Sequence, residues 1–189
     1  MTAEKPALRR EALARRDGIP PDIRAAAGEA VAAHVLTLAD RLEPGPVAGF
    51  VAVRSELDPL PAMRILSRGG LSLALPRVAG DALFFHAWSP GDPLAAGAFG
   101  LSEPLPGAPV VRPSALLVPL AAFDRRGHRI GYGKGFYDRA VAALRATGPL
   151  VTVGIAFAVQ EIRLVPQESH DRALDWIVTE REVIRTATD

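Results

Sequence analysis

The most regular pattern of apolar and polar positions lies between two proline-rich boundaries near the start of the chain. Pro20 and Pro21 precede it, and a Glu-Pro-Gly-Pro run at 43–46 follows it. Between them apolar residues return at helical spacing, at positions 23, 27, 30, 31, 35, 38 and 42, with His34 on the same face. This period predicts a long amphipathic helix over 23–42.

Shorter patterns predict the remaining elements. Helical spacing is found in the first sixteen residues and over 61–68 and 137–146, whereas apolar runs predict strands over 47–53, 71–75, 82–87, 115–120, 151–157 and 176–178. The proline- and glycine-rich stretch 89–113 is expected to be a long surface connection. Strands that alternate with helices predict an α/β fold built on a layered sheet.

Two of the predicted strands lead to polar or glycine-rich segments. Strand 115–120 precedes a glycine-rich loop, and strand 47–53 precedes Glu56. Ligands of such sheets bind beyond the carboxyl ends of the strands. We therefore expect the loop and Glu56 to face one cleft.

Composition narrows the possible partners. A length of 189 residues favours a single domain over 1–189, and 22 basic against 21 acidic side chains leave no surplus charge for nucleic acid. The uncharged run 146–160 is shorter than the ~20 residues that span a bilayer, so no membrane partner is expected. Cysteine is absent, which excludes disulfides and thiolate metal sites and fits a cytoplasmic protein.

The glycine-rich loop is the strongest candidate for chemistry. Gly131, Gly133 and Gly135 alternate with other residues just before a predicted helix, so free N–H groups and the helix dipole would point at one anion. Lys134, one of two lysines beside 20 arginines, suggests a need for a compact charge. The loop lacks the Walker pattern, however, and a flexible turn before a helix is the alternative.

Other candidate residues have ordinary structural interpretations when taken singly. Asp138 can cap the helix that follows the loop, and Asp171 is an acid in a polar segment. Lys5 and Arg9 repel each other at helical spacing unless an anion lies between them. The four histidines show no zinc-type spacing and no serine or cysteine nucleophile motif is present, so a reaction in which the substrate supplies the nucleophile is favoured.

The run 123–139, Phe-Asp-Arg-Arg-Gly-His-Arg-Ile-Gly-Tyr-Gly-Lys-Gly-Phe-Tyr-Asp-Arg, closely resembles the hallmark of the 5-formyltetrahydrofolate cyclo-ligase family. Further matches occur in order along nearly the whole chain: Lys5, Leu8 and Arg9; Arg54 to Glu56; Pro76 and Arg77; Phe99 to Leu101 with Glu103 and Pro104; Phe157 and Gln160; and His170 and Asp171 with Leu174, Asp175, Thr179 and Glu180. Ordered matches of this number are hard to produce by chance.

The resemblance implies an enzyme that uses ATP and Mg²⁺ to convert 5-formyltetrahydrofolate, a reduced folate, to 5,10-methenyltetrahydrofolate. A monomer is expected, although the sequence itself does not give the oligomeric state. The resemblance also implies a three-layer sheet with helices on both faces, like that of sugar-phosphate isomerases and CoA transferases. Lys5, Arg9 and Lys134 would be catalytic, and Asp138 and Asp171 would bind the metal. ATP would contact Lys5, Arg9, Arg129, Ile130, Gly131, Tyr132, Gly133, Lys134, Gly135, Phe136 and Tyr137. Folate would contact Val51, Glu56, Phe99, Tyr132, Gly133, Lys134, Gly135, Phe136 and Tyr137.

The chain departs from the family pattern at a few positions. Phe136 replaces a common tyrosine, Tyr132 stands where some members have arginine, and Ala158 and Val159 replace more polar residues before Gln160. These departures leave two alternatives open. One is a folate- or nucleotide-binding module without turnover, and the other is a small-molecule kinase that uses the same loop.

Overall fold

The computed structural model describes residues 4–42, 45–167 and 171–186. Its helices are α1 (Glu4–Asp17), α2 (Pro21–Leu36), α3 (Ala39–Leu42), α4 (Leu60–Arg68) and α5 (Phe136–Thr147), with short 3-10 turns η1 (Ala98–Gly100) and η2 (Ala158–Gln160). Its strands are β1 (Val47–Ala48), β2 (Leu73–Ala79), β3 (Ala82–Ala87), β4 (Leu94–Ala96), β5 (Ser102–Pro104), β6 (Ala115–Pro119), β7 (Ala122–Phe123), β8 (Arg129–Ile130), β9 (Val151–Ile155), β10 (Trp176–Val178) and β11 (Val183–Arg185).

The described strands form a seven-stranded sheet in the order β11-β10-β9-β6-β1-β2-β3. The inner strands from β10 to β2 pair in parallel, and antiparallel β11 and β3 close the two edges. Two small hairpins, β4-β5 and β7-β8, lie outside this sheet. Parallel strands place their carboxyl ends at one edge, where the loops that follow β1 and β6 meet.

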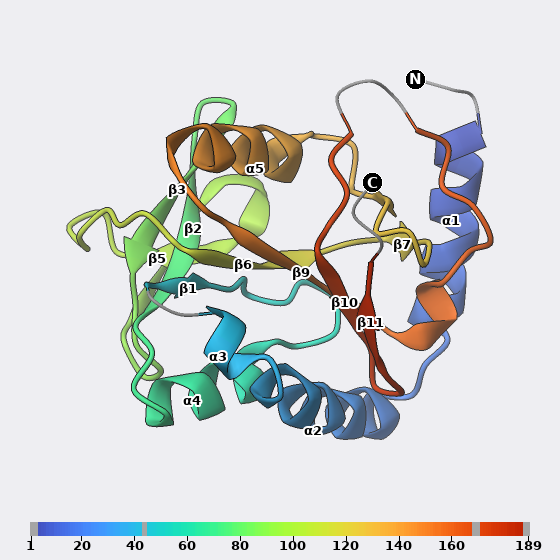
Figure 1. Cartoon of the computed structure of the whole chain (residues 1–189), viewed down its shortest axis with the longest axis horizontal. Helices are drawn as coiled ribbons and strands as arrows, with labels where there is room; N and C mark the ends of the chain where they lie inside the picture. Colours follow the sequence, from blue (N-terminus) through green and yellow to red (C-terminus); the bar gives the residue numbers. More distant parts are fainter. Residues whose placement is uncertain (1–3, 43–44, 168–170, 187–189) are drawn as a thin grey trace.

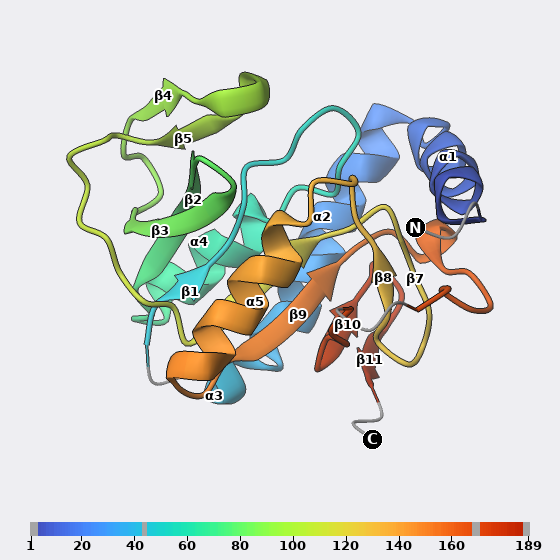
Figure 2. The ribbon, with the colours of Figure 1, turned by 90° about the horizontal axis from the view of Figure 1, so that it is seen from above.

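Helices cover both faces of the sheet (Figure 1). On one face Val31 and Val35 of α2 and Leu66 of α4 belong to the same buried cluster as Leu73 and Leu117 of the sheet. On the other face α5 packs through the buried Val141, in a cluster with Leu116 and Val118. Helix α1 stands apart at one end of the sheet, beside β7 and η2 (Figures 1 and 2). The predicted three-layer α/β architecture is confirmed; the kinship to sugar-phosphate isomerases and CoA transferases stays a prediction.

The predicted helix over 23–42 is wrong in one respect, because it is interrupted after Leu36. The Thr37 hydroxyl donates a 2.7 Å hydrogen bond to the His34 carbonyl, and the backbone N–H groups of Thr37 and Leu38 bond three residues back. A threonine side chain that bonds to the preceding turn competes with the helical pattern. The interruption separates α2 from α3.

Several strand predictions also differ from the structure. The strand expected over 47–53 ends at Ala48, whereas β2 continues past Leu75 to Ala79 because it pairs with β3. The expected surface connection 89–113 contains the β4-β5 hairpin, and the β7-β8 hairpin and β11 were not predicted. Short strands of two or three residues carry too little alternation to be recognised. Helices 61–68 and 137–146 are confirmed within one residue as α4 and α5.

Candidate active site

The buried face of α1 is cationic. Lys5, Arg9, Ala12 and Arg16 follow one another at spacings of four, three and four residues, which places them on one side of the helix. Lys5 and Arg16 are only 7% and 4% exposed. Buried Lys and Arg normally need partners, and α1 therefore directs three cations at the neighbouring segments.

The middle cation of this face contacts the glycine loop. Arg9 Nε donates a 2.7 Å hydrogen bond to the carbonyl of Gly131, and a β-carbon added at Gly133 would lie 3.7 Å from Arg9 Nη1. Gly133 has φ +93°, and Gly135, with φ +67°, is the N-cap of α5. Only glycine adopts such angles readily, so the loop turns sharply and ends with the amino end of α5 at its tip. The N–H groups of the loop, the helix dipole and Arg9 therefore bring positive charge together in one place.

Aromatic rings and cations alternate beside the loop. Lys134 Nζ lies 5.1 Å from the centre of the Phe99 ring, whose centre is 6.1 Å from that of Phe136. On the far side, the Arg139 guanidinium lies 5.4 Å from the centre of Phe136. Phe99 is 66% exposed at φ +58°, an uncommon angle for a bulky residue. The segment between β4 and β5 therefore presents an apolar surface directly opposite Lys134.

The β4-β5 hairpin that carries Phe99 is tied to the sheet by Glu103. This carboxylate is 2% exposed, lies 3.6 Å from Arg77 Nη2 and accepts a 3.0 Å hydrogen bond from the Val78 N–H. Arg77 also donates to the Pro104 carbonyl. The segments 76–77 and 99–104, which both match the motif pattern described in the sequence, thus form one structural unit that holds Phe99 in place.

The two predicted metal ligands lie around one buried guanidinium. Arg129, whose side chain is 4% exposed, donates a 2.6 Å hydrogen bond to Asp138, while Lys5 Nζ donates to Asp171 at 2.6 Å. Burial lowers the pKa of Arg129, and the charges of Asp138 and Asp171 oppose that shift. Both carboxylates therefore act on the same small region below the loop.

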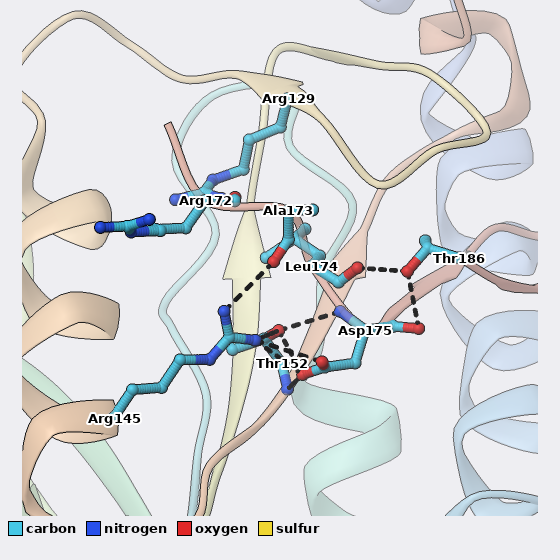
Figure 3. A network of polar contacts seen from close by, with 8 residues as sticks. All are labelled: Arg129, Arg145, Thr152, Arg172, Ala173, Leu174, Asp175 and Thr186. Carbon is cyan, nitrogen blue, oxygen red and sulfur yellow. Dashed lines mark hydrogen bonds and ion pairs between the residues drawn. The ribbon is translucent and has the colours of Figure 1, made fainter. Parts of the chain in front are cut away.

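The segment that carries Asp171 is fixed by a network of polar contacts (Figure 3). Arg129 donates to the Arg172 carbonyl at 2.8 Å, and Arg145 of α5 pairs with Asp175 at 3.1 Å. Asp175 in turn accepts 2.7 Å hydrogen bonds from the N–H and hydroxyl of Thr152. An extended segment without regular structure is thereby held against β9 and α5.

Glu56 lies at the other end of the site. Its Oε2 accepts a 2.8 Å hydrogen bond from the Val53 N–H, and its charge acts on the Tyr132 hydroxyl. Burial, followed by the charge of Glu56, raises the pKa of Tyr137 above its ordinary range. Tyr132 is 43% exposed, and both phenols are neutral at physiological pH, since an ordinary tyrosine loses its proton only near pH 10.

These features coincide with the pattern of one known family. A family model described as the 5-formyltetrahydrofolate cyclo-ligase family matches residues 1–180. The chain belongs to the 5-formyltetrahydrofolate cyclo-ligase family.

Curated members of the cyclo-ligase family align over nearly the whole chain. The 5-formyltetrahydrofolate cyclo-ligase of Mycolicibacterium smegmatis is 31% identical over 193 residues, which cover 95% of each chain. The protein of the same name from Escherichia coli is 31% identical over 179 residues, covering 89% of this chain and 96% of its own.

Solved structures agree with this assignment. The 5,10-methenyltetrahydrofolate synthetase of Aquifex aeolicus superposes with a TM-score of 0.82 at 30% identity, covering 98% of this chain and 94% of its own. The synthetase of Mycoplasma pneumoniae, at 20% identity and a TM-score of 0.70, shares the fold over 93% of this chain. The family and the folate cyclo-ligase class expected from the sequence are confirmed.

Most of the predicted site residues lie on the glycine loop and the segments around it. Ile130 is an exception, because its side chain is 2% exposed in a small core cluster and only its backbone lies along the loop. Val51 packs partly buried against the core near α2 and α4. His170 lies outside the described residues. An open cavity of ≈ 530 Å³ lies elsewhere, beside the β4-β5 hairpin, lined by residues such as Trp88, Pro93 and Leu105.

Gln160 has a structural role, because its side chain is buried and hydrogen-bonded to the backbone of neighbouring segments. It is 1% exposed; its amide donates to the carbonyls of Leu120 and Ala121 at 2.8 and 3.0 Å and its oxygen accepts from the Phe157 N–H. It thus joins the ends of β6 and β9.

The sequence analysis missed Arg16. Its position could have been recognised from helical spacing, because Arg16 lies seven residues after Arg9, on the face that carries Lys5 and Arg9. Arg16 does not belong to the motif that includes Lys5, Leu8 and Arg9, so no function was predicted for it.

Proposed function

We propose that this chain catalyses the ATP- and Mg²⁺-dependent conversion of 5-formyltetrahydrofolate to 5,10-methenyltetrahydrofolate, with release of ADP and phosphate. Family membership supports the reaction. One structural observation supports the glycine loop as the place where it occurs. The cationic face of α1 meets the glycine loop through the 2.7 Å hydrogen bond from Arg9 to Gly131. A glycine loop, a helix amino end and several cations close together suit a polyphosphate.

The phosphate end of the proposed site comprises Lys5, Arg9, Lys134 and the loop backbone. Arg9 and Lys134 would balance the charge that spreads over the transferred phosphoryl group, and the amino end of α5 would add its partial charge. Lys5, held 2.6 Å from Asp171, would exchange part of that contact for a phosphate oxygen. Arg129 through Tyr137 are proposed to contact ATP, with Ile130 contributing its backbone alone.

Asp138 and Asp171 are proposed to hold Mg²⁺. Their carboxylate oxygens are donors that a hard cation prefers, and both influence Arg129. Within the described residues no group of three or more metal-binding side chains occurs, which fits an ion that completes its shell with waters and phosphate oxygens. When bound, the ion would neutralise charge on the phosphates.

The folate end would be formed by Glu56 and the aromatic residues. Glu56 would accept paired N–H donors of the pterin ring, since its carboxylate has lone pairs beyond the one used by Val53. Phe99 and Phe136 would pack on the ring system, with Val51 and Tyr137 beside it. Tyr137 would stay neutral and donate a hydrogen bond.

The proposed reaction proceeds in three steps. The formyl oxygen attacks the γ-phosphorus as the bond to ADP breaks, and the lone pair on N5 forms a carbon–nitrogen double bond. The neighbouring nitrogen, N10, then attacks the same carbon and loses its proton. Finally the carbon–oxygen bond breaks, phosphate leaves with the former formyl oxygen, and the methenyl cation remains. The protein orients the reactants and stabilises charge, and no enzyme nucleophile is required.

A turnover assay tests the proposal. Protein, ATP, Mg²⁺ and 5-formyltetrahydrofolate are mixed, and methenyl absorbance and free phosphate are followed together. The proposal predicts that both signals appear and that each disappears when ATP is omitted. Ligand binding by calorimetry without either signal would indicate a binding module, and phosphate retained on a folate product would indicate a kinase.

None of the described helices meets the length and apolarity needed to cross a membrane. A cytoplasmic location and a monomer remain proposals.

A further inference from the structure

Arg16 is a buried cation without an assigned role. Its Nε donates to the Ser55 hydroxyl at 3.0 Å and its Nη1 donates to the Tyr132 hydroxyl at 2.6 Å. The carboxylate of Asp17 is 3.7 Å from Nε but 62% exposed, so water screens that ion pair. Burying a guanidinium against two hydroxyl groups costs free energy, which suggests that the contacts serve the site.

The Tyr132 hydroxyl can only accept a hydrogen bond from Arg16, and it can donate one to another group. A guanidinium has no acceptor, so the phenol oxygen accepts from Arg16 and its single proton is free to be donated. The Glu56 carboxylate is close enough to act on this phenol, which makes it the acceptor toward which that proton can turn. A phenol is protonated at physiological pH, so this donor is available to Glu56 there.

Arg16 also reaches Glu56 through the backbone. Ser55, which accepts from Arg16 and donates to Asp17, directly precedes Glu56. The preceding residue, Arg54, has φ +57°, so the turn from Val53 to Glu56 is bent into an uncommon conformation. The Glu56 N–H bonds back to the Val53 carbonyl at 3.1 Å, which closes this turn.

We propose that Arg16 is a positioning residue for the folate end of the site, which holds the Glu56 carboxylate in its binding orientation through Tyr132 and Ser55. The inference rests on the proposed function, in which Glu56 binds the pterin ring.

Two ligand titrations test this role. Dissociation constants are measured by calorimetry for 5-formyltetrahydrofolate without ATP and for ATP without folate, with the wild type, Arg16→Met and Arg16→Lys. Methionine keeps much of the side-chain length and removes the donors. We expect the folate constant to rise roughly five- to thirty-fold in Arg16→Met, while the ATP constant changes by less than about two-fold. Arg16→Lys restores one donor and is expected to fall between.

A matched control and a double-mutant cycle separate positioning from general stability. Arg10→Met removes the same charge from an exposed position on the same helix and should leave both constants unchanged. Tyr132→Phe should weaken folate about as much as Arg16→Met, and the double variant should be weaker by less than about a further two-fold. A merely structural role predicts additive losses instead. If Arg16→Met does not fold, Tyr132→Phe and Ser55→Ala must still weaken folate selectively.

The possible failures are distinguishable. If Glu56→Gln weakens folate but a folded Arg16→Met does not, or if Arg16→Met weakens both ligands equally, the positioning role is wrong and the proposed function stands. If the wild-type protein does not bind 5-formyltetrahydrofolate at all, the proposed function fails and this inference fails with it.

Discussion

The ammonium of Lys134 lies over the ring of Phe99, 5.1 Å from its centre, although 35 residues separate them in the chain. The first belongs to the loop proposed to bind phosphate, and the second projects from η1 with 66% of its surface exposed. A cation–π contact at an exposed site contributes about 0.5 to 1 kcal/mol, so an arriving phosphate can readily draw the ammonium away. The contact therefore places a residue proposed to bind phosphate directly beside a residue proposed to bind the folate.

Lys134→Ala should lower kcat by roughly thirty- to a thousand-fold, because loss of one charge that stabilises the transition state costs about 2 to 4 kcal/mol. The exposed loop contributes little to the core, so the unfolding temperature should hardly change. Lys134→Arg should restore little, since its planar group is bulkier and differently hydrated. A folded Lys134→Ala protein with a kcat near that of the wild type would refute the catalytic role.

Asp138→Asn should raise the Mg²⁺ concentration that gives half-maximal rate, because an amide oxygen is a weaker ligand than a carboxylate for a hard cation. Asp171→Asn should act in the same direction. Rates are measured across a Mg²⁺ series at fixed ATP, with the exposed Asp81→Asn as the control for loss of one negative charge near the loop.

Both aspartates also pair with buried cations, so stability must be measured alongside. If the two variants unfold at lower temperature but keep the wild-type Mg²⁺ curve, then Asp138 and Asp171 are partners of Arg129 and Lys5 and not metal ligands.

Much of the fold could be predicted from the sequence, because α2, α4, α5, β3, β6 and β9 carry long or uninterrupted patterns. The sequence could not reveal the β4-β5 and β7-β8 hairpins, since strands of two or three residues depend on tertiary contacts such as that between Arg77 and Glu103. The loop and Lys5 and Arg9 were found through their motif. The contact between Arg16 and Tyr132 joins segments over a hundred residues apart in the chain, so the sequence could not reveal it. The pairing of Asp138 with Arg129 depends on the burial of Arg129, which is also a property of the folded chain.

Glu56→Gln should weaken folate roughly ten- to one-hundred-fold, because hydrogen bonds to a charged acceptor contribute about 1.5 to 3 kcal/mol. The ATP constant should stay within a few-fold, since the proposed pterin contact lies at the other end of the site from the phosphates. Calorimetric titration with each ligand alone measures both constants. Equal losses, or a loss for ATP alone, would mean that the proposed orientation of the folate is wrong.

Tyr137 should resist ionisation in the folded protein. Burial raises its pKa above the ordinary value of about 10, and the charge of Glu56 adds to the shift. Above that pH the unfolded chain loses this proton first, so the free energy of unfolding should fall as pH rises beyond about 10. Tyr132, the other tyrosine, is 43% exposed, so the measurement uses a Tyr132→Phe variant. In that variant tyrosinate absorbance should appear only together with alkaline unfolding, whereas in denaturant it should appear near pH 10. Tyrosinate formed near pH 10 while the fold is intact would contradict the buried environment of Tyr137.

The fate of the formyl oxygen tests the central claim most directly. 5-Formyltetrahydrofolate labelled with ¹⁸O in the formyl group is converted with ATP and Mg²⁺, and the released phosphate is analysed by mass spectrometry. Attack of that oxygen on the γ-phosphorus predicts one labelled oxygen in each phosphate and one methenyl product per phosphate. Unlabelled phosphate, or phosphate that remains attached to a folate product, would contradict the proposed reaction.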